Sequence, residues 1–175
     1  MNIANIFFYV SGAVAVLSTF MVITRRNGVH ALLYLIVSFL ALAFVLSLLG
    51  APFVAALEVI IYAGAIMVLF VFVMMMLNLG PDSYQQKKAW MNLRIWTGPS
   101  ILAAILLAEL VMIVGGVGPR ALMPRVIGPK EVSVAMFGTY LLGIELSSML
   151  LLAGMVGAYH LGRREDALPG DGRES

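Results

Sequence analysis

The sequence predicts an all-α, polytopic integral membrane protein with five transmembrane helices. Of its 175 residues, 62% are hydrophobic and 11% are charged, and the mean hydropathy is +1.01. An ordinary soluble domain carries roughly 25% charged residues, which help to cover its core. The apolar residues fall in five stretches, each close to the roughly 20 residues that a helix needs to cross a bilayer. Short polar or Gly/Pro-rich links separate these stretches.

The boundaries of the five spans follow from these links. The first span begins next to the initiator methionine with no basic segment before it, so we expect it to be retained rather than removed as a signal peptide. Pro52 suits the first turn of the third span, where a missing N–H costs nothing. Trp90 and Trp96 lie in the link after that span, as is typical of a membrane interface. In chain order, we expect the spans at about 3–23, 30–49, 53–77, 99–117 and 133–161.

The chain shows no internal repeat, so we expect one membrane domain over residues 1–164. Residues 165–175 are charged and contain Gly and Pro, and we expect a disordered tail there.

The lysine and arginine residues predict the orientation, because cytoplasmic links carry the excess of these residues. One group lies after the first, third and fifth spans, and the other lies between the fourth and fifth. This bias predicts a periplasmic N-terminus and a cytoplasmic C-terminus. The larger group holds eight of the eleven residues: Arg25, Arg26, Lys87, Lys88, Arg94, Arg163, Arg164 and Arg173.

The rarity of metal-binding side chains limits the chemistry of the chain. Cysteine is absent, which excludes disulfides, thiolate-bound iron–sulfur clusters and a cysteine nucleophile. The only histidines, His30 and His160, lie at ends of spans, where an interfacial hydrogen bond is favoured over haem ligation. We therefore expect no catalytic residue, cofactor or metal site in this chain.

The third span is the best candidate for a functional site. It carries Glu58 and Tyr62, which are four residues apart and share a helix face. An ionisable side chain in a membrane helix costs about 2.5–3.5 kcal/mol and usually marks a functional site. The alternative is that Glu58 only fixes packing against a neighbour. Ala63, Gly64 and Ala65 follow, and they predict either close helix packing or a π-bulge, with packing favoured by the residues alone.

Two further carboxylates lie in predicted spans. Glu145 precedes Ser148 by three residues in the fifth span and is a candidate either for a polar path or for a structural contact. Glu109 lies in the fourth span, and we assign it no role.

Several segments resemble the subunit J family of bacterial NADH-quinone oxidoreductase, which is respiratory complex I; its mitochondrial counterpart is NADH dehydrogenase subunit 6. The resemblance covers about residues 5–163. It is carried by VHALLYL from Val29, by LEVIIYAGAIMVLFVF from Leu57 and by ELSSMLLLAGMV from Glu145.

This resemblance implies a small membrane subunit near the quinone-binding arm, in an obligate hetero-oligomer of the bacterial inner membrane. It implies that flavin, iron–sulfur clusters, NADH and quinone are bound by other subunits. It also implies a π-bulge at Tyr62, Ala63, Gly64 and Ala65 that gates a hydrated path coupling quinone reduction to proton pumping. Glu58, Tyr62 and Glu145 are then candidates for the proton path.

Two other functions stay open at this point. One is a subunit of a related cation/proton antiporter or membrane-bound hydrogenase, and the other is a purely structural scaffold.

Overall fold

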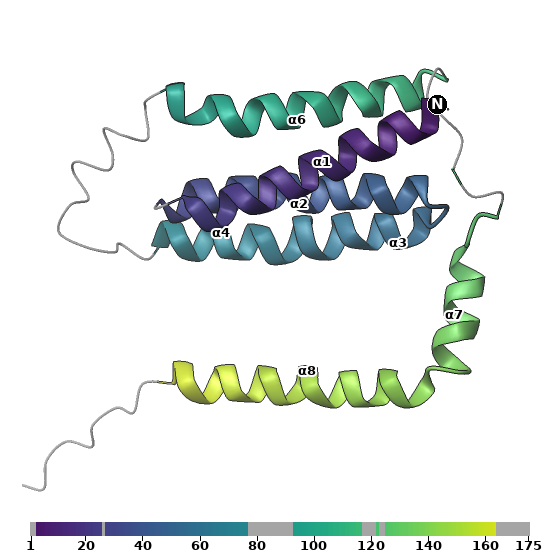
Figure 1. The fold of residues 1–175 in the computed structure, drawn as a ribbon. Helices are drawn as coiled ribbons and strands as arrows, with labels where there is room; N and C mark the ends of the chain where they lie inside the picture. The colour runs from purple at the N-terminus through teal and green to yellow at the C-terminus, as the bar shows by residue number, and fades with distance from the viewer. Residues whose placement is uncertain (1–2, 26, 77–92, 117–121, 123–124, 164–175) are drawn as a thin grey trace, which may run out of the picture. The chain divides into compact units, whose positions relative to one another are not determined.

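The computed structural model describes residues 3–25, 27–76, 93–116, 122 and 125–163. All regular structure in these ranges is helical (Figure 1). The elements are α1 (Ile3–Thr24), α2 (Gly28–Leu48), α3 (Pro52–Leu57), the π-helix η1 (Glu58–Ile66), α4 (Met67–Met76), α6 (Leu93–Val114), α7 (Pro129–Phe137) and α8 (Leu141–Gly162).

Five helices of the described chain are long and apolar enough to cross a membrane. They are α1, α2, the continuous helix Pro52–Met76 formed by α3, η1 and α4, the segment Trp96–Val114 of α6, and α8. For the described residues, the prediction of an all-α fold with five helices able to span a membrane is therefore confirmed. The direction in which the chain crosses the membrane stays a prediction.

The chain divides into two compact parts, one up to Gly128 and one from Pro129. In the first part α1, α2, the central helix Pro52–Met76 and α6 lie side by side (Figure 1). The prediction of one membrane domain over 1–164 stays a prediction, and the expected tail, 165–175, lies outside the described residues.

Local sequence signals account for the turns between the first helices. The side chain of Asn27 accepts a hydrogen bond from the amide of Val29 and so caps the start of α2. Gly50 has a positive φ of 87°, which suits glycine, and ends the turn after α2. Pro52 stands in the first turn of α3, as predicted. After α6, the amides of Leu122 and Ile127 donate to the carbonyls of Leu48 and Gly50, at 2.7 and 2.8 Å.

A small apolar cluster joins α1, α2 and α6. Val14, Val37, Ala41 and Leu106 are buried and pack together. On α1 the buried positions are Phe7, Ser11, Val14 and Ser18, whose spacing of four, three and four places them on one helical face. Along this face of α1, an apolar side chain therefore alternates with a serine hydroxyl.

Two helices of the structure differ in extent from the spans that the sequence predicts. The fourth helix begins at Leu93 rather than near Pro99, and it continues through that proline. Gly98 lies against the hydroxyl of the buried Tyr34 of α2, so α2 and α6 approach closely there.

The fifth predicted span, 133–161, is two helices in the structure. In this second part of the chain α7 ends at Phe137, and α8 begins at Leu141. The amide of Tyr140 bonds to the carbonyl of Ala135, five residues earlier, which closes α7 next to Gly138. The 22 residues of α8 span about 33 Å at 1.5 Å per residue, close to the roughly 30 Å hydrocarbon core.

Candidate functional site

The central membrane helix contains a nine-residue π-helical segment. The π-helix η1 covers Glu58–Ile66 and continues without a break from α3 and into α4. Its last bond runs from the amide of Met67 to the carbonyl of Tyr62, five residues earlier. The segment contains the four residues Tyr62–Ala65 at which the resemblance placed a bulge, and it extends four residues before them.

The local sequence weakens the regular α-helix at this place. Val59, Ile60 and Ile61 are β-branched and lose side-chain freedom in an α-helix. Gly64 costs about 1 kcal/mol relative to alanine.

The backbone at Gly64 leaves little room for a side chain. A Cβ atom built there would lie 3.2 Å from the carbonyl oxygen of Val59, five residues earlier. That distance is shorter than an ordinary van der Waals contact between a carbon and a carbonyl oxygen. The Val59 carbonyl must therefore shift slightly if any other residue replaces Gly64.

Buried residues anchor the helix on both sides of the π segment. Ala55 in α3 and Met67 in α4 are 7% and 3% exposed. None of the nine residues of η1 is buried in this chain. The segment is thus anchored at its ends, whereas its own side chains remain accessible in the isolated chain.

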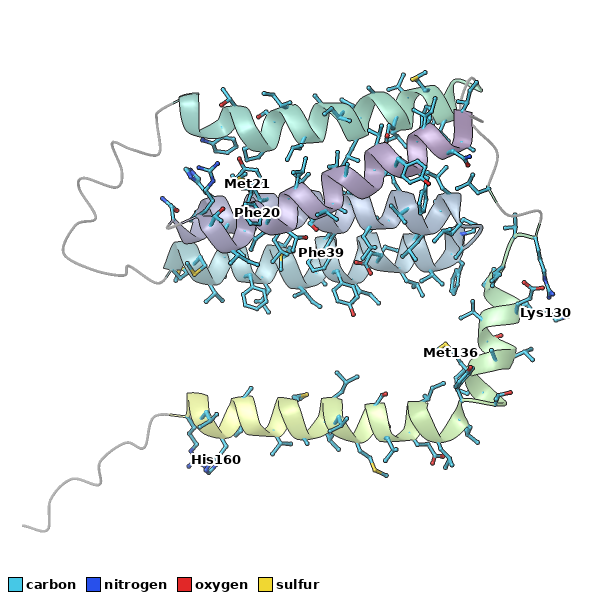
Figure 2. The ribbon with its side chains drawn as sticks, in the orientation of Figure 1. Phe20, Met21, Phe39, Lys130, Met136 and His160 are labelled. Atoms are coloured by element: carbon cyan, nitrogen blue, oxygen red, sulfur yellow. The ribbon has the colours of Figure 1, made fainter. Side chains whose placement is uncertain are left out.

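One aromatic contact joins the segment to α2. The rings of Phe39 and Tyr62 have their centroids 5.3 Å apart and are tilted by 41°. Figure 2 labels Phe39 in the layer between α2 and the central helix. Tyr62 remains 44% exposed in this chain.

Glu58 lies at the start of η1 and is half-buried. Within the described residues no hydrogen bond links its carboxylate to Tyr62, although both side chains belong to the same segment. The pairing that their spacing allows is therefore not formed in this conformation.

Glu145 is exposed in α8. The hydroxyl of Ser148 donates to the backbone carbonyl of Glu145 at 2.7 Å, and that of Ser147 donates to the carbonyl of Gly143 at 2.7 Å. Both serines are thus bonded to the backbone of their own helix rather than to the carboxylate. Glu145 lies in the second part of the chain, whereas Glu58 and Tyr62 lie in the first.

Comparison with known proteins gives the family. A family model described as NADH-ubiquinone/plastoquinone oxidoreductase chain 6 matches residues 18–161. The chain belongs to this family. It is 52% identical to NADH-quinone oxidoreductase subunit J of Escherichia coli K12 over 160 residues, which are 91% of this chain and 87% of that protein. It is 54% identical to the subunit J of Pseudomonas aeruginosa over 159 residues, 90% of this chain and 96% of that protein.

Proteins named subunit J are subunits of NADH-quinone oxidoreductase, a multi-subunit enzyme. Among the described residues of this chain, no three His, Cys, Asp or Glu residues are grouped so as to hold a metal ion. His30 lies in the first turn of α2 and His160 in the last turn of α8 (Figure 2).

One carboxylate that this chain 6 protein buries was not assigned from its sequence. Glu109 of α6 is only 6% exposed, and it accepts a hydrogen bond from the hydroxyl of Ser11, at 2.6 Å from Ser11 Oγ to Glu109 Oε2. The pair joins residues 98 positions apart. The seven-residue spacing of Ser11 and Ser18 on a mostly apolar helix was the available signal, but it does not identify the partner.

Proposed function

We propose that this chain 6 protein is a membrane subunit of a proton-translocating NADH:quinone oxidoreductase, in which its π-helical segment is a conformational gate. The gate opens and closes a hydrated path that couples quinone reduction to proton pumping. The observation that supports it most is the π segment Glu58–Ile66, which lies between two buried anchors and is itself unburied.

The geometry of the segment explains how such a gate works. A π-helical stretch accommodates an extra residue compared with a regular α-helix, and each α-helical residue turns the chain by about 100°. Conversion to a regular helix therefore rotates α4 relative to α3. Met67, which is buried in the π form, then leaves its packed position, and the directions in which Phe70 and Phe72 point change with it.

Polar side chains in the same helix provide the ends of a water path. Glu58 and Tyr62 are the polar residues of the π segment, and the free Tyr62 phenol can bind water. Glu145 is a third candidate for the path, contributed by α8. A change in the π segment turns Tyr62 relative to Glu58, so the path is made or broken without a redox step in this chain.

Membership of such a complex also implies where the cofactors are bound, which partners this chain has and where in the cell it lies. Flavin, iron–sulfur clusters, NADH and quinone are then bound by other subunits, and the lack of cysteine excludes thiolate-bound iron–sulfur clusters from this chain. The helix α8 is mostly apolar and has no buried residue in the isolated chain, which suits a helix covered by lipid and neighbouring membrane subunits in an inner membrane. The positive-inside bias puts the N-terminus in the periplasm and the C-terminus in the cytoplasm.

Replacing Gly64 by Leu tests the gate. The variant is made in the assembled complex and reconstituted in vesicles. We expect NADH oxidation with an artificial acceptor to stay within about twofold of wild type, and quinone-coupled proton pumping to fall by about tenfold or more. The matched control is Gly12→Leu, because Gly12 of α1 has open space around its Cβ position. Normal pumping by Gly64→Leu contradicts the gate.

Glu58→Gln separates the gate from a scaffold role. A proton path predicts a complex that assembles but pumps slowly, whereas a scaffold predicts loss of the assembled complex. Blue native electrophoresis and a pumping assay on the same membranes distinguish the two results.

A further inference from the structure

The strongest unassigned feature is the buried carboxyl group of Glu109. Its Oε2 atom accepts the hydrogen bond from Ser11, whereas Oε1 is buried and has no partner among the described residues. A second buried oxygen on the same face of α1, Ser18 Oγ, also lacks a partner there. Buried polar atoms are almost always bonded to protein or to ordered water, so each of these atoms requires a partner.

The helices that pack against α6 carry no lysine or arginine side chain within their described residues. These helices are α1 and α2. The described residues of α1 carry no charged side chain, and its one tyrosine, Tyr9, is exposed. On α2 the titratable groups are His30 and Tyr34, and Tyr34 meets α6 at Gly98, eleven residues before Glu109. The central helix, which carries Glu58, packs against α2 rather than α6.

A buried carboxylate without a counter-charge is costly, so this environment favours the neutral acid. Since Ser11 donates to Oε2, the acid proton belongs on Oε1. That O–H group finds no acceptor among the described protein atoms. An ordered water molecule, which both accepts and donates, satisfies it.

An apolar layer lies on one side of this carboxyl group. Val14, Val37, Ala41 and Leu106 pack together three residues beyond Ser11 on α1 and three residues before Glu109 on α6. Beyond that layer, the hydroxyl oxygens of Thr19 and Ser38 lie 2.8 Å apart, and each lies within hydrogen-bond distance of the carbonyl oxygen of Ala15, at 2.9 and 3.2 Å. Because each hydroxyl has one proton, one of them donates to the other, which donates to the carbonyl. On its other side Glu109 is five residues from the end of α6 at Val114, next to the start of α1.

From this arrangement we propose that Glu109 is a second intramembrane proton-binding site, which exchanges its proton through a water molecule on Oε1. In this exchange the O–H bond at Oε1 breaks and the proton passes to the water, leaving a carboxylate that Ser11 still bonds. The proton leaves toward the end of the bundle where α1 begins and α6 ends. The apolar layer of Val14, Val37, Ala41 and Leu106 closes the route to the opposite side.

Infrared difference spectroscopy on the purified, assembled complex tests this proposal. The protonated carboxyl band present in wild type is expected to be lost from Glu109→Gln at neutral pH. It should shift in frequency after transfer to D₂O, because the proton exchanges with water. Ser11→Ala keeps the acid and is expected to shift the band, since one hydrogen bond to the carboxyl group is removed.

Glu131→Gln serves as the matched control, because Glu131 is an exposed carboxylate of α7. Its removal is expected to leave the protonated band unchanged. If Glu109→Gln and wild type show equal bands, Glu109 is ionised and the proposal is wrong. It is equally wrong if the Glu109 band keeps its frequency in D₂O, because the carboxyl group is then sealed from water. Neither result depends on the gate in the central helix.

Discussion

The amide of Met67 is bonded to the carbonyl of Tyr62, five residues earlier, and Met67 is also one of the most buried side chains of the central helix. The residue that ends the π segment is thus the residue that anchors α4. Any change in the backbone bonding of this segment must either move Met67 out of its packing or rotate α3, so the two events are linked.

We expect Gly64→Ala to shift the segment toward the regular α-helix. Alanine is favoured over glycine by about 1 kcal/mol in a helix, equivalent to about a fivefold change in the balance of the two forms. The close approach of Val59 to the Cβ position acts in the same direction. Backbone hydrogen exchange of residues 58–67 in the assembled complex should become slower than in wild type. Unchanged exchange would count against a π segment in equilibrium with an α-helix.

Phe39→Leu should weaken the packing of the π segment against α2. An aromatic pair of this geometry contributes about 0.5–1.5 kcal/mol beyond its buried area. We expect a modest fall in pumping with normal assembly, measured as the ratio of protons pumped to NADH oxidised. Phe20→Leu is the control, because Phe20 lies on the exposed side of α1. Equal ratios for the two variants would show that the ring pair does not support the segment.

Ser11→Ala should destabilise the pairing of α1 with α6 more than removal of both polar groups. Among the described residues, Ser11 is the one side chain that donates to Glu109, and its loss costs about 1–3 kcal/mol for a buried acceptor. In Ser11→Ala/Glu109→Leu no polar atom of the pair is left without a partner, and stability should recover. Thermal inactivation of the complex compares the variants. A double variant less stable than Ser11→Ala would contradict this account.

Gly98→Leu should prevent normal packing of α2 against α6, because a side chain at Gly98 would overlap the buried Tyr34 hydroxyl. We expect a strong loss of assembled complex on native gels. Gly98→Leu combined with Tyr34→Ala should recover part of it by making space. If Gly98→Leu alone assembles normally, the close approach of the two helices is wrong.

Single cysteines test the orientation, since the chain has none of its own. Arg25→Cys follows α1 and Ile127→Cys precedes α7, and the two residues are predicted to lie on opposite sides of the membrane. In spheroplasts, a membrane-impermeant maleimide should label the cysteine at position 127 and spare that at position 25. The reverse pattern would invert the predicted topology.

Much of the fold was predictable from hydropathy alone, because five apolar stretches of membrane-spanning length leave few alternatives to five helices. The exceptions have local causes. Pro99 was expected to begin a span, yet α6 passes through it, and Gly138 lies where one long predicted span becomes α7 and α8. Terminal residues of helices are the least certain part of such predictions, since propensity differences there are small.

The candidate site was predictable in position but not in detail. Glu58, Tyr62 and Gly64 were identified from their place in an apolar helix, whereas a nine-residue π-helix depends on how Ala55 and Met67 are anchored by α2. The Ser11–Glu109 bond joins two helices far apart in sequence, and no spacing within either helix predicts it.

The most direct test of the gate is the backbone bonding of Glu58–Ile66 in the assembled complex, determined by electron cryomicroscopy with the quinone site empty and with a quinone-site inhibitor bound. We expect the Met67 amide to bond to Tyr62 in one state and to Ala63 in the other, with α4 rotated between them. A Met67–Tyr62 bond and an unrotated α4 in both states would contradict the account.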